Sequence, residues 1–201
     1  MVAYVFDKLL AQGVRAGQIP ARTQAARDWY RDEAERTTTV TQAQVMKPED
    51  KARFRGKHII GEMYMFQYNP KWKKTLPYYD IFPCVFPIDD APGGFLGINM
   101  HYLPLKMRAL LMDALYGVTT NKKYDNKTKL RLSYDLLNGA SKFRWFKPCI
   151  KHYLKSQMNS RLLNISASEW DIAIFLPLAR FKKATQQQVW KESQQIIKGR
   201  K

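Results

Sequence analysis

The spacing of apolar residues changes twice along the chain and separates three segments. Residues 2–12 and the stretch after Thr23 carry apolar side chains every three or four positions, which predicts two helices. Between residues 61 and 103, aromatic and β-branched residues are punctuated by Pro, Gly and Asn, a pattern typical of short strands joined by tight turns. From Pro104 onward the helical spacing returns. The sequence therefore predicts an α+β fold.

The predicted architecture is a small antiparallel β module, SH3-like or a meander barrel, followed by a C-terminal helical bundle and preceded by an N-terminal helical arm. Residues 1–48 are predicted to form the arm, which includes a polar linker over residues 37–44. Residues 49–103 form the β module, and residues 104–201 form a helical subdomain packed on it. A chain of 201 residues is long enough for one domain with a sizeable core and an extra arm.

One strand of the β module carries a row of aromatic side chains. Residues 62–68 alternate so that Tyr64, Phe66 and Tyr68 share one face. Such a row either packs into a core or stacks nucleobases, as in proteins that bind single strands, and the core interpretation is favoured. The following turn has a basic, aromatic tip in which Trp72 stands among three lysines.

Proline and glycine residues determine which backbone conformations are expected in the rest of the β module. Pro77, Pro83 and Pro87 have no N–H to donate to a β ladder, so residues 75–88 are predicted to be edge strands or irregular extended chain. Gly93 and Gly94 supply the flexible positions of a hairpin.

In the C-terminal half, helices are predicted over residues 104–116 and 130–137, with Gly117 and Gly139 as stop signals. Another is predicted from Pro148 to residue 162, and its lysines at positions 147, 151 and 155 would share one exposed face. Ser166 and Glu169 form a capping box that opens a buried helix ending at Pro177. A last helix starts after residue 185.

The N-terminal arm offers candidate partner contacts. Thr23 is a plausible N-cap for the second helix, whose Arg27 and Arg31 are spaced to form ion pairs with acidic neighbours on an exposed face. Trp29 and Tyr30 need apolar surface to pack on, either the core or a neighbouring subunit, and we favour the neighbour. These two residues are the predicted partner-binding positions.

The net charge of +17 is distributed unevenly. The first fifty residues contain seven basic and seven acidic residues, so the whole surplus follows Pro48. A compact basic domain attracts polyanions, of which nucleic acid is the commonest, although solubility or contact with acidic proteins would also explain the charge. The candidate DNA-binding residues are Lys51, Arg53, Arg55, Lys57, Lys71, Lys73, Lys74, Lys147, Lys151, Lys155, Arg180, Lys182 and Lys183.

Catalytic, metal-binding and cofactor-binding sites are not predicted. The three histidines lack metal-ligand spacing, and Cys84 and Cys149 form no Cys-x-x-Cys pair, which favours a reducing, cytoplasmic folding environment. The carboxylates available to a metal-dependent nuclease are Glu62, Asp80 and the Asp89–Asp90 pair, which is better explained by a turn. No signal peptide or membrane-spanning run is apparent. We therefore predict a protein that is not an enzyme, with the nuclease as the minor alternative.

Three runs of the β module carry a family resemblance: residues 61–66, residues 74–88 with their Phe-Pro pairs, and residues 94–104. They resemble small structural proteins of T-even-type contractile-tailed bacteriophages and of cyanophages, and within that group the DNA end protectors, which are late head-completion proteins. The resemblance implies a virion protein, made in the host cytoplasm, that meets the end of the packaged genome near the portal and neck and shields it from exonucleases. It supplies no catalytic residues.

The implied partners are phage genomic DNA and other virion proteins of the portal, neck or tail, with an oligomeric state in the particle and no membrane. Two alternatives stay open. One is a purely architectural neck, tail or baseplate component, and the other is a head-completion nuclease.

Overall fold

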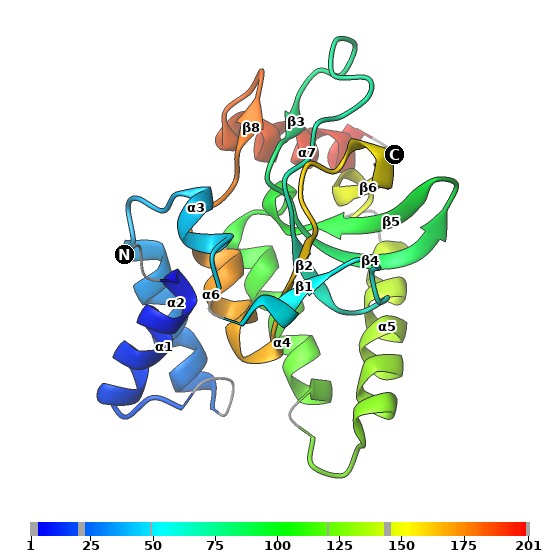
Figure 1. The fold of residues 1–201 in the computed structure, drawn as a ribbon. Helices are drawn as coiled ribbons and strands as arrows, with labels where there is room; N and C mark the ends of the chain where they lie inside the picture. Colours follow the sequence, from blue (N-terminus) through cyan, green and yellow to red (C-terminus); the bar gives the residue numbers. More distant parts are fainter. Residues whose placement is uncertain (1–3, 20–22, 49, 120, 143–145, 200–201) are drawn as a thin grey trace.

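In the computed structural model, the chain folds around one curved antiparallel sheet with helices along its flanks (Figure 1). The structure describes residues 4–19, 23–48, 50–119, 121–142 and 146–199. The sheet has the strand order β1-β7-β2-β4-β5-β6. Its strands are β1 (Phe54–Arg55), β2 (Met63–Met65), β4 (Cys84–Ala91), β5 (Gly94–Asn99), β6 (Ile150–Leu154) and β7 (Leu162–Ile165). A second, two-stranded sheet pairs β3 (Tyr79–Asp80) with β8 (Phe181–Lys182).

The helices lie on several sides of the sheet (Figure 1). On one flank lie α1 (Val5–Arg15), α2 (Gln24–Arg36) and α3 (Gln42–Val45). The other helices are α4 (Leu105–Thr119), α5 (Asn126–Lys142), α6 (Trp170–Phe175) and α7 (Gln186–Gly199). Short 3-10 turns precede or follow several strands: η1 (Lys51–Arg53), η2 (Met100–Tyr102), η3 (Lys147–Cys149), η4 (Lys155–Gln157) and η5 (Ala167–Glu169).

The α+β class is confirmed, but the sheet is not a closed barrel. An antiparallel bridge between Tyr68, after β2, and Met158, between β6 and β7, extends the pairing of β2 with β7. The sheet is curled, because the rings of Phe66, after β2, and Tyr153 of β6 meet with centroids 5.3 Å apart although β2 and β6 are not neighbours in it. The ladder nevertheless stays open between β6 and β1, so neither the SH3-like nor the meander-barrel form is correct.

The prediction of a helix from Pro148 to residue 162 is wrong. Residues 150–165 instead form β6, η4 and β7, and both strands join the central sheet. Apolar residues spaced three or four apart also fit two short strands joined by a turn, and the ladder along β5 stabilises the strand here. As a result the lysines at 147, 151 and 155 lie in η3, β6 and η4 rather than on one helix face.

The edge position expected for residues 75–88 is also wrong for β4, which lies between β2 and β5. Pro87 fits there because β2 pairs only with Cys84 and Val85 and ends before it. The Pro87 carbonyl accepts a hydrogen bond from Gly61 N–H at 3.0 Å, and the ladder to β5 is irregular just after Pro87. The missing proline N–H therefore leaves no regular ladder position unfilled.

The aromatic row is core, as expected. Tyr64 and Phe66 are fully buried and Tyr68 is 8% exposed. They pack with Phe95, Tyr153 and neighbours in a small cluster that is separate from the main core. Base stacking on Tyr64 and Phe66 is therefore not available in this fold.

The N-terminal helices are attached to the rest of the chain by a buried ion network. The Thr23 cap is confirmed, since its side chain accepts from Ala26 N–H. Arg27 and Arg31 are buried rather than exposed, which corrects the expected location, whereas one of the expected ion pairs is present, between Arg31 and Asp28 at 3.2 Å. Both guanidinium groups bind Asp113 of α4, at 2.6 and 2.7 Å, and Asp171 of α6, at 3.0 and 2.7 Å.

Other local signals had mixed outcomes. The capping box of Ser166 and Glu169 is present, and α6 is buried over most of its length. Val40, within the expected linker, and Val45, just after it, are buried, so this segment packs against the core. Helices α4 and α5 continue past Gly117 and Gly139, where stops were expected. The division of the chain into residues 1–48, 49–103 and 104–201 stays a prediction.

Candidate nucleic-acid interface

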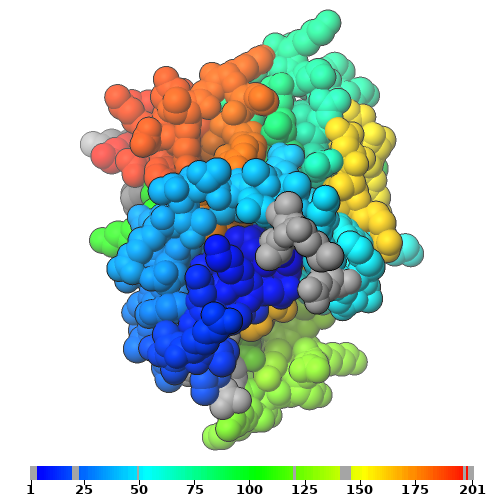
Figure 2. Space-filling model, turned by 60° about the vertical axis from the view of Figure 1, so that its left-hand side comes forward, coloured from blue at the N-terminus to red at the C-terminus, as the bar shows by residue number. Residues whose placement is uncertain are grey.

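Three segments without acidic residues meet along one side of the molecule. They are residues 51–61, residues 63–79 and residues 146–168. The Asn69 N–H donates to the Gln157 carbonyl at 2.9 Å, and the Arg161 guanidinium donates to the Phe54 carbonyl at 2.6 Å. Figure 2 shows residues 150–165 between the segment of residues 66–75 above and that of residues 51–57 below.

Eight exposed cations of these segments form what we call the basic ridge: Lys51, Arg55, Lys57, Lys71, Lys73, Lys74, Lys155 and Arg161. Seven of them were candidates from the sequence, and Arg161 was missed because it stands alone among polar residues. The nearby carboxylate of Asp90, on the β4–β5 hairpin, is hydrogen-bonded to His58 at 2.8 Å. The ridge is therefore a surface rich in cations that suits a polyanion.

The upper end of the ridge is the turn of residues 70–75, which we call the tip. Trp72 is 64% exposed there, and the Lys71 ammonium lies 5.1 Å from the centre of its indole ring. Lys183, which follows β8 directly, supports the tip, because its ammonium donates to the carbonyls of Lys74 and Leu76 at 3.0 and 2.8 Å. Lys182 beside it is exposed. The tip is thus held in place while its own lysines remain at the surface.

Two predicted DNA-binding cations take part in the fold instead. Arg53 forms an ion pair with buried Glu169 and also donates to the Asn164 carbonyl. The Arg180 guanidinium donates to the backbone carbonyls of Val40 and Pro177. Lys147 is exposed, but it stands at the opposite end of β6 from Lys155. The structure thus does not bring these three together with the tip.

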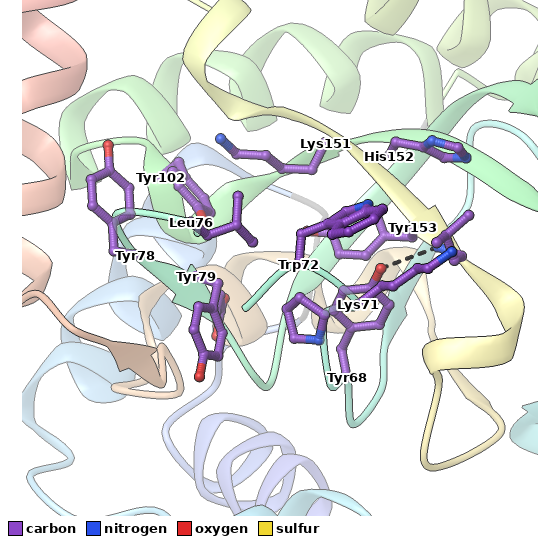
Figure 3. A pocket seen from close by; sticks show the side chains of 13 residues that line it. Tyr68, Lys71, Trp72, Leu76, Tyr78, Tyr79, Tyr102, Lys151, His152 and Tyr153 are labelled. Carbon is purple, nitrogen blue, oxygen red and sulfur yellow. Dashed lines mark hydrogen bonds between the residues drawn. The ribbon is translucent and has the colours of Figure 1, made fainter. Parts of the chain in front are cut away.

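Beneath the tip lies a pocket of about 270 Å³ (Figure 3). Its walls are mainly aromatic: Tyr68, Trp72, Tyr78, Tyr79, Tyr102 and Tyr153. Two lysines, Lys71 and Lys151, also line it. In Figure 3, Tyr78, Leu76 and Tyr102 gather at one end, Trp72 stands near the middle, and Lys151 reaches over the upper side. The lining comes from three separate parts of the chain, residues 68–80, 102 and 151–154, so no local sequence signal pointed to it.

Lys151 is the unusual cation of this pocket. Its ammonium lies 4.2 Å from the centre of the Tyr102 ring, and the residue is half-buried. Burial lowers the pKa of Lys151 below its ordinary value. Within the described part of the chain, no carboxylate lies within salt-bridge distance of it. A half-buried ammonium without an ion-pair partner is suited to receive an anion.

The pocket floor is fixed by a buried polar network. The Asp80 carboxylate is 2.6 Å from His101 Nδ1, and it also accepts from the N–H groups of Phe82 and Arg180. Asn99 joins the network to the wall, because its amide donates both to Asp80 and to the Tyr153 hydroxyl. The network holds Tyr153 in position.

Burial and hydrogen bonding determine the charge states of Asp80 and His101. Burial by itself would raise the pKa of Asp80, but His101 and the donors from Phe82 and Asn99 lower it below the ordinary value. Burial lowers the pKa of His101, against the opposing effect of the Asp80 carboxylate. The pair therefore consists of a charged carboxylate and a neutral imidazole that donates through Nδ1.

We expect the free energy of unfolding to fall as the pH drops below about 6.5, because the unfolded imidazole then binds a proton that native His101 resists. The free energy of unfolding falls with acidification because the pKa of His101 is lower in the folded protein than in the unfolded chain. Asp80 adds a further loss below about pH 4, the ordinary carboxyl range. Denaturant unfolding across pH measures the effect, and imidazole NMR assigns it to His101. The exposed His152→Gln variant should keep the same profile; stability that rises with acidification would contradict the assignment.

The carboxylates considered for a nuclease are engaged elsewhere. Glu62 accepts from the Tyr64 hydroxyl at 2.7 Å and from the Asn164 amide at 2.9 Å, and Asp80 is buried with His101. Among the described residues, no three His, Cys, Asp or Glu side chains are grouped so as to hold a metal ion. Both cysteines are free and buried, and burial raises their pKa to about 12. Over the same residues, no helix has the length and apolar character needed to cross a membrane.

The two predicted partner-binding residues, Trp29 and Tyr30, differ in their burial. Tyr30 is 2% exposed and lies in the core of the chain itself, where its ring contacts Gly13 and its hydroxyl donates to the Gln18 carbonyl at 3.2 Å. Trp29 packs edge-on against it and is only half-buried. Of the two, only Trp29 presents surface to another protein.

The model of a family described as Phage T4 terminal DNA protecting protein matches residues 6–195 of the 201. The chain belongs to this family. The match runs from α1 into α7, so it includes the basic ridge, the pocket and the N-terminal helices. It confirms the expected likeness to DNA end protectors. No curated protein and no solved structure shows significant similarity to the chain.

Proposed function

We propose that this chain is a non-enzymatic phage virion protein that binds the end of the packaged DNA in the head-neck or portal region and protects it. The basic ridge is its DNA-binding face. The observation that carries the proposal is the meeting of three acid-free segments on one side of a chain whose family is named for protecting terminal DNA. Eight exposed cations on this side of the molecule supply the positive charge that a phosphate backbone attracts.

The basic ridge contacts the phosphate backbone of DNA and does not read the base sequence. Its cations are mostly lysines, which act as point charges for phosphates, and a protector of genome ends needs no base-specific readout. Other virion proteins of the portal, neck or tail are the proposed protein partners, contacted in part through Trp29. In this proposal the chain works in the virion, in several copies.

An exonuclease protection assay tests the proposal. A linear duplex mixed with the full chain should resist added exonucleases at low salt and lose that protection as salt rises, because released counterions make phosphate binding salt-dependent. An internal restriction site on the same duplex should remain cleavable, which shows that the ends are what is covered. The absence of binding to duplex or single strands at low salt would favour the architectural alternative. Cleavage with magnesium and no added enzyme would instead show a nuclease.

A further inference from the structure

The pocket beneath the tip has a chemistry that the ridge alone does not use. Trp72 and Tyr78 stand at its opening, the first strongly exposed and the second half-buried, whereas Tyr102 and Tyr153 form deeper walls with 4% and 3% exposure. Aromatic faces lining one cavity offer stacking surfaces to a flat ring, and nucleobases of every sequence have such a face.

The cations of the pocket fit an anion attached to that ring. Lys151 reaches over the cavity without a carboxylate partner in the described chain, and Lys71 lies at the rim over Trp72 (Figure 3). The one acidic residue of the lining is Asp80, and its carboxylate is fully occupied by His101 and backbone donors. A ring together with a phosphate therefore matches the pocket better than a neutral or cationic ligand.

Size limits the ligand to one nucleotide. The volume of about 270 Å³ is just below the range of roughly 300–1,000 Å³ that is usual for pockets holding drug-sized molecules. A base pair within a duplex cannot enter it, but a base at the end of a strand is already unpaired or frays at small cost. The pocket is also continuous with the tip, so a strand lying on the ridge would reach it at its end.

We propose that this pocket takes up one unpaired nucleotide at the end of a DNA strand, with the base stacked among Trp72, Tyr78 and Tyr102 and its phosphate held by Lys71 and Lys151. The inference deepens the proposed function and rests on it. It gives the protein a means of distinguishing a DNA end from the duplex interior, which phosphate contacts along the ridge do not provide.

Two matched DNA ligands test the pocket with the full chain. One is a short duplex with a single-stranded overhang of ordinary nucleotides, and the other is identical except that its overhang is abasic, with the same phosphates and no bases. Fluorescence anisotropy should show the first binding at least about tenfold more tightly, the effect of stacking one base. Trp72→Ala should remove this preference and leave the affinity for the abasic ligand nearly unchanged. Lys151→Gln should weaken binding of the ordinary overhang as well.

Tyr124→Ala is the matched control, since Tyr124 is an aromatic residue 38% exposed outside the pocket, between α4 and α5. It should keep the full preference for bases. If the wild-type chain bound both ligands equally, with steep salt dependence, the proposal that the pocket binds a terminal nucleotide would be wrong and the proposed function would stand. Failure to bind either ligand at low salt would overturn both.

Discussion

Replacing Lys71, Lys73 and Lys74 together by alanine should lower the affinity for duplex DNA by roughly tenfold to a hundredfold at low salt. Each lost phosphate contact should also reduce the slope of log affinity against log salt by about 0.9. The three side chains are exposed at the tip, so the free energy of unfolding should change by less than about 0.5 kcal/mol. Anisotropy titrations over a salt series, paired with denaturant unfolding, measure both quantities.

A second triple variant provides the control. Lys122, Lys123 and Lys127 are also exposed, and they stand between α4 and α5 and at the start of α5, at the far end of the molecule from the tip (Figure 1). Their replacement by alanine removes the same net charge and should leave the salt slope unchanged. Equal losses in the two variants would mean that only overall charge matters. Unchanged affinity in the tip variant would place the DNA-binding face elsewhere on the basic surface.

Replacing Asp171 by alanine should lower the free energy of unfolding by about 3–5 kcal/mol, the usual result of removing one partner from a buried ion pair. Asp171 accepts from the Nε–H groups of both Arg27 and Arg31, whose side chains are only 1% and 7% exposed. Without it, the two buried guanidinium groups would keep only Asp113, which is 38% exposed, and, for Arg31, Asp28, which is 54% exposed, and water screens both carboxylates. Denaturant unfolding of both proteins at neutral pH measures the loss.

Glu33→Ala is the matched control for that variant. Glu33 pairs with Arg36 on the outer side of the same helix, where the arginine side chain is 72% exposed. Removing this pair should cost about 0.5 kcal/mol or less. If Asp171→Ala were no more harmful than Glu33→Ala, the buried network would not be what attaches α2 to α4 and α6.

Local signals in the sequence determined several elements without help from the tertiary structure. The cap at Thr23 and the capping box of Ser166 and Glu169 are satisfied by hydrogen bonds within a few residues, so the helix starts could be predicted. The alternation of Tyr64, Phe66 and Tyr68 also suffices to predict a buried face, because the period of a strand is fixed by its backbone.

Elsewhere, distant partners decided between conformations that the sequence alone left equivalent. Residues 150–154 fit a helix by spacing, but the free edge of β5 makes them a strand. Arg27 and Arg31 have the spacing of surface ion pairs, and only the approach of α4 and α6 buries them. Pro87 is tolerated inside the sheet because β2 ends before it.

The same division holds for function. The sequence by itself determined a basic chain without a metal motif, with its positive charge after Pro48 and the resemblance to DNA end protectors. Only the tertiary structure assembled the basic ridge from three segments, removed Arg53 and Arg180 from it, and enclosed the aromatic pocket under the tip. The physical reason is that charge and helix caps are properties of single residues and near neighbours. A surface or a cavity is made by side chains whose proximity depends on strand order and on how far the sheet curls.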